Sequence, residues 1–187
     1  RDEEAMPAVE RFGVRFPFAA TAFGTALEMV RGSRRLEIDA GGASVPLLGL
    51  LHARTAESIE AELQALIDAG YRTVKVKVGF DPAEDARMVK LVQCATRGRV
   101  QIRLDANQGY TADEGIQFVK TLDPSDIELF EQPCAAGDWE AHLAVRRASP
   151  VPMMLDESIY SVEDIEKAVR LDAAAYIKVK LMKFVTL

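Results

Sequence analysis

The sequence predicts an α/β protein, a parallel β/α array that forms an incomplete (β/α) barrel. Five short apolar segments each end in a charged residue, at Lys77, Asp105, Glu131, Asp156 and Lys180. The spacing between these residues is nearly constant, and every gap holds a helix-like segment. In a parallel β/α array the carboxyl ends of the strands gather at one face. These five side chains are therefore expected to converge on one site.

The first 45 residues carry the weakest pattern. Residues 18–30 mix apolar and small side chains, which predicts a helix packed on a larger body. Gly41 and Gly42 then interrupt the chain. The apolar run 45–51 has Pro46 near its start, where a missing N–H matters least, and it predicts the first buried strand.

The next two helices have clear start signals. Thr55 is a suitable N-cap, and Gly70 supplies a stop for a helix whose apolar face is Ile59, Leu63, Leu66 and Ile67. Asp81–Glu84 combines a cap, a proline at the first helical position and a glutamate three residues after the cap. The inner face of this second helix is expected to be Met88, Leu91 and Val92.

Three more helices complete the alternation. Thr111–Glu114 is a second capping box, and further helices are expected over 138–147 and after Ser161. Six nearly continuously apolar strands thus alternate with five helices, as in a sheet covered on both faces. A doubly wound sheet also fits, but no Gly-rich phosphate loop follows the first strand, and the charges are spread over five strand ends. A closed barrel needs eight strands, so a fragment, or a chain lacking segments, is expected.

The lysines occur in pairs on one strand face. Lys75 and Lys77 point the same way, as do Lys178 and Lys180, because strand side chains alternate. Two ammonium groups about 6 Å apart at an effective dielectric of about 20 repel by roughly 3 kcal/mol, or about two pKa units. This repulsion is expected to bring one ammonium toward neutrality and make it a base. The alternative is a solvated Lys-x-Lys on an edge strand.

Three carboxylates are expected at the same edge, those of Asp105, Glu131 and Asp156. Three anions at one face repel unless a cation lies among them, and oxygen ligands suit Mg²⁺ or Mn²⁺. Taken singly, each could instead be a helix cap or a surface ion pair. Their recurrence at one interval, with lysines before and after, favours the metal site.

This combination of groups indicates a reaction. A metal bound to a small-molecule carboxylate substrate stabilises the enediolate that forms when the neighbouring carbon loses its proton. One lysine would remove that proton, and a lysine on the opposite side would return one. A Schiff-base aldolase using Lys180 is an alternative, although it leaves the three carboxylates unexplained. An inactive fragment or a binding-only relative is another.

Composition excludes several classes of protein. The 187 residues are 49% hydrophobic and 28% charged with a net charge of −6, as in an ordinary globular protein and not a nucleic-acid-binding one. No apolar run approaches the roughly 20 residues of a membrane span. Cys94 and Cys134 lack metal-ligand spacing and are expected to be reduced, in a cytoplasmic protein without a signal peptide. His52 and His142 show no partner motif and are not expected to be catalytic.

The five strand-end motifs resemble the enolase superfamily, in its muconate-lactonizing-enzyme subgroup (mandelate racemase/muconate lactonizing enzyme-like). The matching motifs lie at Val74–Gly79, Arg103–Asn107, Phe130–Pro133, Leu155–Ser158 and Val179–Lys183. The resemblance covers roughly residues 45 to 183. Two places depart from the pattern: Lys178 stands where relatives often carry Asn, and residues 184–186 stand where they commonly carry Gly-Gly.

The resemblance implies a fold and a set of roles. The fold would be a (β/α) barrel of enolase-superfamily type, with 46–187 as a partial barrel and 1–45 as the remnant of an α+β capping domain. The reaction would be racemisation or epimerisation, cycloisomerisation, or β-elimination, in a homo-oligomer. The metal ligands for Mg²⁺, or Mn²⁺, would be Asp105, Glu131 and Asp156. The acid/base pair would be Lys77 and Lys180, with Lys75 tuning Lys77.

Overall fold

The computed structural model describes residues 4–32, 41–42 and 44–184, which form two compact units. The smaller unit comprises Arg1–Ser44, Tyr160–Val162 and Val179–Leu187, and the larger comprises Val45–Ile159 and Glu163–Lys178. Parts of the expected capping remnant, and the positions 185–186 that replace Gly-Gly, lie outside the described residues. The assignment of residues 1–45 to a capping domain stays a prediction.

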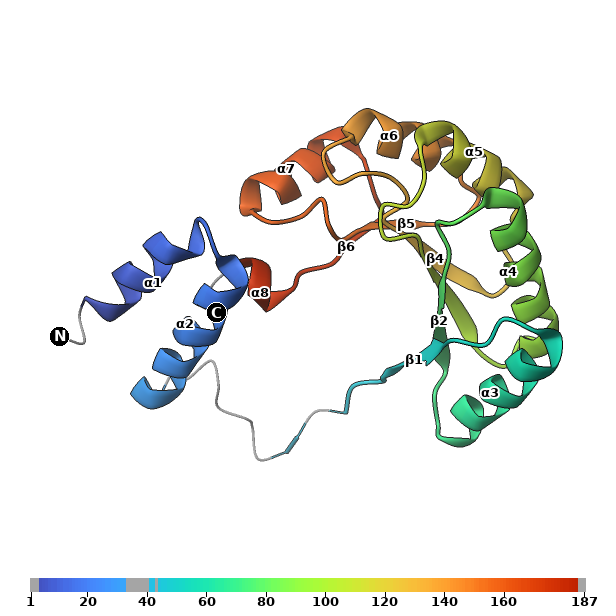
Figure 1. Cartoon of the computed structure of the whole chain (residues 1–187), viewed down its shortest axis with the longest axis horizontal. Helices are drawn as coiled ribbons and strands as arrows, with labels where there is room; N and C mark the ends of the chain where they lie inside the picture. Colours follow the sequence, from blue (N-terminus) through green and yellow to red (C-terminus); the bar gives the residue numbers. More distant parts are fainter. Residues whose placement is uncertain (1–3, 33–40, 43, 185–187) are drawn as a thin grey trace. The chain divides into compact units, whose positions relative to one another are not determined.

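The larger unit is built on one parallel six-stranded sheet in the order β1-β2-β3-β4-β5-β6. Helices α3 to α7 connect successive strands and lie along the outer side of the curved sheet (Figure 1). The elements are β1 Leu48–Leu51, α3 Ala56–Asp68, β2 Thr73–Lys77, α4 Pro82–Thr96, β3 Gln101–Asp105, α5 Ala112–Thr121, β4 Ile127–Glu131, α6 Trp139–Ala148, β5 Met153–Leu155, α7 Val162–Leu171 and β6 Tyr176–Ile177. The predicted alternation of six strands and five helices is confirmed.

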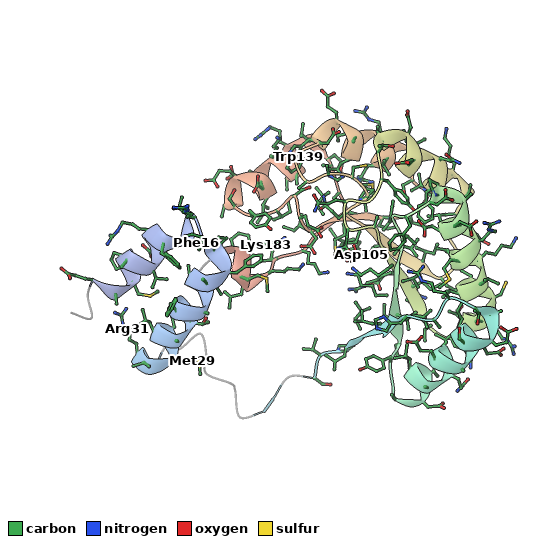
Figure 2. All side chains as sticks on the ribbon, viewed as in Figure 1. Phe16, Met29, Arg31, Asp105, Trp139 and Lys183 are labelled. Carbon is green, nitrogen blue, oxygen red and sulfur yellow. The ribbon has the colours of Figure 1, made fainter. Side chains whose placement is uncertain are left out.

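The strands pair so that their charged ends coincide. Lys77 pairs with Asp105 across β2 and β3, and Asp105 pairs with Glu131 across β3 and β4. Alternate residues face the helices, where the buried core includes Val74, Val76, Ile102 and Leu104. Figure 2 shows Asp105 on the inner side of the strand array and Trp139 on the outer helix layer. The register therefore collects the charged strand ends at one inner edge.

The helices of the larger unit begin where the sequence predicts. The side chain of Thr55 accepts a hydrogen bond from the N–H of Ser58, and Thr111 and Glu114 cap each other reciprocally. The Asp81 carboxylate accepts the N–H groups of residues 83 and 84, which confirms the cap. In the second half of the expected capping box, the Glu84 side chain would accept the N–H of Asp81. That N–H donates to the Asp85 carboxylate instead.

Several boundaries and faces differ from expectation. Strand β1 begins only at Leu48, while Val45 and Leu47 are exposed, because this edge strand pairs on one side only within the described sheet. The last strand, expected over 176–180, ends at Ile177. Leu91 was expected on the inner face of α4 but is 41% exposed. The buried face of α4 has the spacing i, i+3, i+4 and i+7 and comprises Asp85, Met88, Val89 and Val92.

The smaller unit contains α1 Ala5–Gly13, α2 Pro17–Arg31 and the short α8 Leu181–Phe184. The predicted helix over 18–30 is confirmed as α2, but its large apolar ends are exposed, Phe18 at 56% and Val30 at 86%. Its buried positions are the small residues Ala20, Thr21 and Gly24. Across both units, none of the helices in the described residues has the length and apolarity needed to cross a bilayer.

Candidate active site

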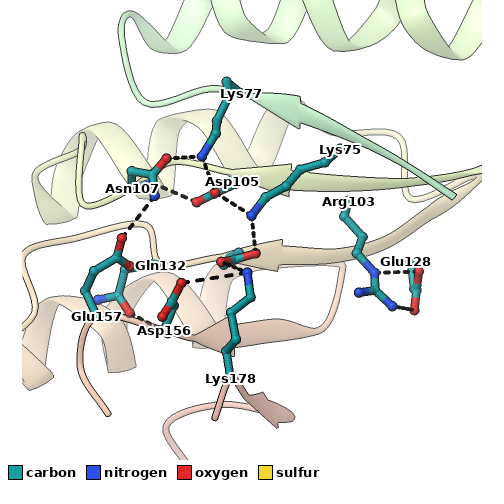
Figure 3. Close-up of polar contacts among 11 residues, drawn as sticks. Lys75, Lys77, Arg103, Asp105, Asn107, Glu128, Gln132, Asp156, Glu157 and Lys178 are labelled. Atoms are coloured by element: carbon teal, nitrogen blue, oxygen red, sulfur yellow. Dashed lines mark hydrogen bonds and ion pairs between the residues drawn. The ribbon is translucent and has the colours of Figure 1, made fainter. Parts of the chain in front are cut away.

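The strand ends of the larger unit gather three carboxylates and three lysines (Figure 3). The carboxylates of Asp105, Glu131 and Asp156 belong to residues that are each 1% exposed. Burying isolated carboxylates is costly unless they are paired with cations. The surrounding cations include the ammonium groups of Lys75, Lys77 and Lys178.

Both lysines of β2 bind the carboxylate at the end of β3. The Lys75 Nζ lies 2.6 Å from Asp105 Oδ2 and 2.9 Å from Glu131 Oε2, so it bridges two strand ends. The Lys77 Nζ lies 2.5 Å from the same Asp105 oxygen and also donates to the Asn107 side-chain oxygen. The predicted shared orientation of Lys75 and Lys77 is thus confirmed. Their exposure differs, because the Lys77 side chain is 44% exposed and that of Lys75 only 9%.

A third lysine bridges the other two carboxylates. Lys178 directly follows β6, and its Nζ lies 2.6 Å from Glu131 Oε1 and 3.7 Å from Asp156 Oδ2. Its backbone N–H donates to the carbonyl oxygen of Leu155 at 2.8 Å, which fixes this segment against β5. The charges therefore alternate along the edge of the sheet from β2 to the segment after β6.

The buried ion pairs shift two pKa values. Burial lowers the pKa of Lys75, but its hydrogen bonds to Asp105 and Glu131 and their negative charges outweigh burial and raise it. Burial raises the pKa of Asp105, but the hydrogen bonds and charges of Lys75 and Lys77 outweigh it and lower it. The pKa of Lys75 therefore moves away from neutrality, because two carboxylates lie within 3 Å of its ammonium group. The expectation that one ammonium of the pair is brought toward neutrality stays a prediction.

A buried amide ties the end of β4 to the loop after β5. Gln132 Oε1 accepts the backbone N–H groups of Asp156 at 2.8 Å and Ser158 at 3.2 Å, and its Nε2 donates to Ser158 Oγ at 2.7 Å. His142, 0% exposed, places its Nε2 3.1 Å from the Ala135 carbonyl oxygen and 3.1 Å from Gln132 Nε2. Sequence reasoning missed this network, although Gln132 directly follows Glu131. The network holds the backbone of Asp156 in place.

A second network holds the loop that follows Lys77. Asp85 Oδ2 accepts three backbone N–H groups, those of residues 79–81, at 2.8 to 3.1 Å, and the Tyr110 hydroxyl at 2.6 Å. Gly79 has φ +95°, and a Cβ there would collide with the carbonyl oxygen of Ala106. A glycine is therefore required where this loop passes the next strand end.

The site has the donor chemistry of a cation site but a different arrangement. Within residues 4–32, 41–42 and 44–184, no three His, Cys, Asp or Glu side chains are grouped so that they could hold a metal ion. Ammonium groups lie between the carboxylates instead. The three buried acids, Asp105, Glu131 and Asp156, offer only oxygen ligands, the type that Mg²⁺ and Mn²⁺ prefer. Their role as metal ligands stays a prediction.

The remaining candidate, Lys180, belongs to the smaller unit and is half-buried. Its carbonyl oxygen accepts the N–H of Lys183 at 2.9 Å, at the start of α8. The pairing of Lys180 with Lys77 across a substrate stays a prediction.

The chain is similar in sequence to known enzymes. A family model described as "Enolase C-terminal domain-like" matches residues 58–185. The L-Ala-D/L-Glu epimerase of Thermotoga maritima is 36% identical over 131 residues, which cover 69% of this chain and 38% of that protein. Muconate cycloisomerase 1 of Rhodococcus opacus is 33% identical over 188 residues, which cover 95% of this chain and 50% of that protein. The chain thus spans half or less of the length of these relatives.

Solved structures share the fold. Muconate cycloisomerase from Pseudomonas fluorescens has a TM-score of 0.81 at 26% identity, covering 98% of this chain and 53% of that one. Dipeptide epimerase from Cytophaga hutchinsonii, complexed with Mg and D-Ala-L-Val, has a TM-score of 0.70 at 23% identity. The match covers 91% of this chain and 45% of that one. At that identity the second likeness concerns the fold alone.

Proposed function

The chain belongs to the Enolase C-terminal domain-like family, and we propose that its strand-end site removes a proton from the carbon next to a carboxylate of a small-molecule substrate. Membership confirms the resemblance to the enolase superfamily and the fold expected from it, an incomplete barrel of that type. One observation carries the proposal: three buried carboxylates alternate with ammonium groups at the carboxyl ends of neighbouring strands.

The exposure of the lysines assigns their roles. Lys77, 44% exposed at its side chain, can reach a substrate. After it has released one proton to solvent, its neutral amine would accept the α-proton at Nζ. Asp105 and Asn107 hydrogen bond to that Nζ and orient it. Lys75, enclosed between Asp105 and Glu131, would act through this carboxylate pair rather than touch the substrate. Lys180 remains the predicted second acid or base.

A divalent cation, Mg²⁺ or Mn²⁺, would be held by Asp105, Glu131 and Asp156. When bound, it would stabilise the negative charge that develops on the substrate carboxylate. The backbone contacts of Gln132 hold the loop that carries Asp156, so the backbone of this ligand would already be in place when the cation binds.

The names of the relatives narrow the reaction to be tested. They are an L-Ala-D/L-Glu epimerase, an N-succinyl-L-Arg/Lys racemase and a muconate cycloisomerase. We therefore favour isomerisation, by racemisation, epimerisation or cycloisomerisation, over β-elimination. A homo-oligomeric state and a cytoplasmic location stay predictions.

Exchange of the α-proton tests the proposal. The protein is incubated with Mg²⁺ in deuterated water and a panel of dipeptides, N-succinyl amino acids and muconate, and deuterium uptake is followed by NMR. Lys77→Met should slow exchange by about 10²-fold or more, whereas Lys90→Met, on the exposed side of α4, should leave it unchanged. No exchange on any substrate, with equal Mg²⁺ affinity in Asp105→Asn and the wild type, would refute the proposal. A borohydride-trapped adduct on Lys180 would support the aldolase alternative.

A further inference from the structure

The third lysine of the site, Lys178, bridges two carboxylates that the proposed function assigns to a cation. Its Nζ lies 2.6 Å from Glu131 Oε1 and 3.7 Å from Asp156 Oδ2 (Figure 3). Both carboxylates are buried, and Glu131 binds Lys75 through its other oxygen. Lys178 therefore completes the alternation of charge along the edge.

The formal charges of the three carboxylates and the three lysines balance because of this residue. The three carboxylates are matched by the ammonium groups of Lys75, Lys77 and Lys178. Without Lys178 the same set would carry one net negative charge. A divalent cation placed among these oxygens meets the repulsion of an ammonium that already uses two of the carboxylates. The balance thus disfavours cation binding.

Lys178 differs from Lys75 in its freedom to move. The Lys75 side chain is 9% exposed and lies between Asp105 and Glu131, whereas that of Lys178 is 31% exposed. Lys178 also follows a strand of only two residues, Tyr176–Ile177. Its long side chain can leave the carboxylates for solvent while its backbone stays bonded to Leu155.

We propose that Lys178 is an internal counter-cation that occupies the Glu131–Asp156 part of the site, competes with the divalent cation and lowers the metal affinity. This inference rests on the proposed function, in which Glu131 and Asp156 hold that cation. Lys178 is thus a positioning residue: its ammonium lies beside two buried carboxylates until a metal ion replaces it.

Mn²⁺ binding, measured by electron paramagnetic resonance on the full chain, tests the proposal. Lys178→Gln should bind Mn²⁺ about tenfold more tightly than the wild type, which corresponds to about 1.4 kcal/mol. Lys120→Gln makes the same charge change on the exposed side of α5 and should stay within about twofold of wild type. Lys178→Arg keeps the positive charge and should also stay near the wild-type affinity.

Thermal unfolding supplies a readout independent of activity. Without metal, Lys178→Gln should melt below the wild type, because the buried carboxylates of Glu131 and Asp156 lose the ion pairs that they form with Lys178. Added Mn²⁺ should raise its melting temperature more than that of the wild type, because ligand binding to the folded state stabilises it. If Lys178→Gln folds only with Mn²⁺, that result agrees with the proposal.

Two outcomes separate failure of this inference from failure of the proposed function. If Asp156→Asn weakens Mn²⁺ binding while Lys178→Gln leaves it equal or weaker, the counter-cation role is refuted and the metal site stands. Tighter binding in Lys178→Arg would also refute the counter-cation role. If Asp156→Asn does not change Mn²⁺ binding, the cation does not lie among these carboxylates, and both proposals fail.

Discussion

Removing the Asp85 carboxylate should destabilise the larger unit and release the loop after Lys77. One oxygen of Asp85, a residue 2% exposed, accepts the N–H groups of residues 79–81 and the Tyr110 hydroxyl. Asp85→Ala leaves these four donors without their acceptor. Burial, with the hydrogen bond to Asp85, raises the pKa of Tyr110, so the phenol remains a donor at neutral pH.

The cost follows from how well water can replace the lost acceptor. Tyr110 is 4% exposed, so its orphaned hydroxyl should cost about 1–3 kcal/mol. Phe80 is 72% exposed, so water can reach part of the neighbouring backbone and reduce the cost of its N–H groups. We expect about 3–5 kcal/mol in all for Asp85→Ala. Tyr110→Phe removes a single hydrogen bond and should cost about 1 kcal/mol.

Urea unfolding and hydrogen exchange test this prediction. Asp85→Ala should lower the free energy of unfolding by the amount above and speed amide exchange at residues 79–81. Asp113→Ala, an exposed acid in the first turn of α5, is the control and should cost less than about 1 kcal/mol. A cost for Asp85→Ala no larger than that of the control would refute the reasoning.

Two other predictions use matched pairs of residues. Burial lowers the pKa of His142, so the unfolded chain takes up the proton first as the pH falls below about 6.5, and stability should fall by up to about 1.4 kcal/mol per pH unit. Urea unfolding between about pH 8 and pH 5.5 should show this slope in the wild type and lose it in His142→Gln. His52 is exposed, so the control His52→Gln should keep the slope. Loss of the slope in His52→Gln and not in His142→Gln would contradict the prediction. Burial also raises the pKa of the Cys134 thiol to about 11, whereas Cys94 is exposed. A thiol reagent should therefore label Cys94 in the folded protein and Cys134 only after unfolding. Peptide mass spectrometry would measure the labelling of each cysteine. Equal labelling rates would contradict this.

Local signals in the sequence were sufficient for the order of elements and for the gathering of most charged side chains at the strand ends. The caps at Thr55, Asp81 and Thr111 depend on neighbours within three residues, so the helix starts could be predicted. The spacing between the charged residues at successive strand ends is set by the lengths of the strands and helices between them, which the sequence pattern predicts. Parallel pairing of β3 with β4, which includes a register shift between Ile102 and Arg103, then brought Asp105 beside Glu131, as expected.

Other features depend on contacts between segments far apart in the chain. The exposed side of α4 at Leu91 was missed, because the face that packs is set by neighbouring elements. The raised pKa of Lys75 was missed, because it depends on carboxylates from β3 and β4 at under 3 Å.

The sequence by itself determined that acids and lysines would meet at the carboxyl edge of a β/α array, because a regular interval and alternating side chains suffice for that. Only the tertiary structure decided how they pair. Lys178 lies 47 positions from Glu131 in the chain, and its ammonium binds that carboxylate only through the sheet order and the path of the segment after β6. Ion pairing at these distances depends on fractions of an ångström, which no spacing in a sequence specifies.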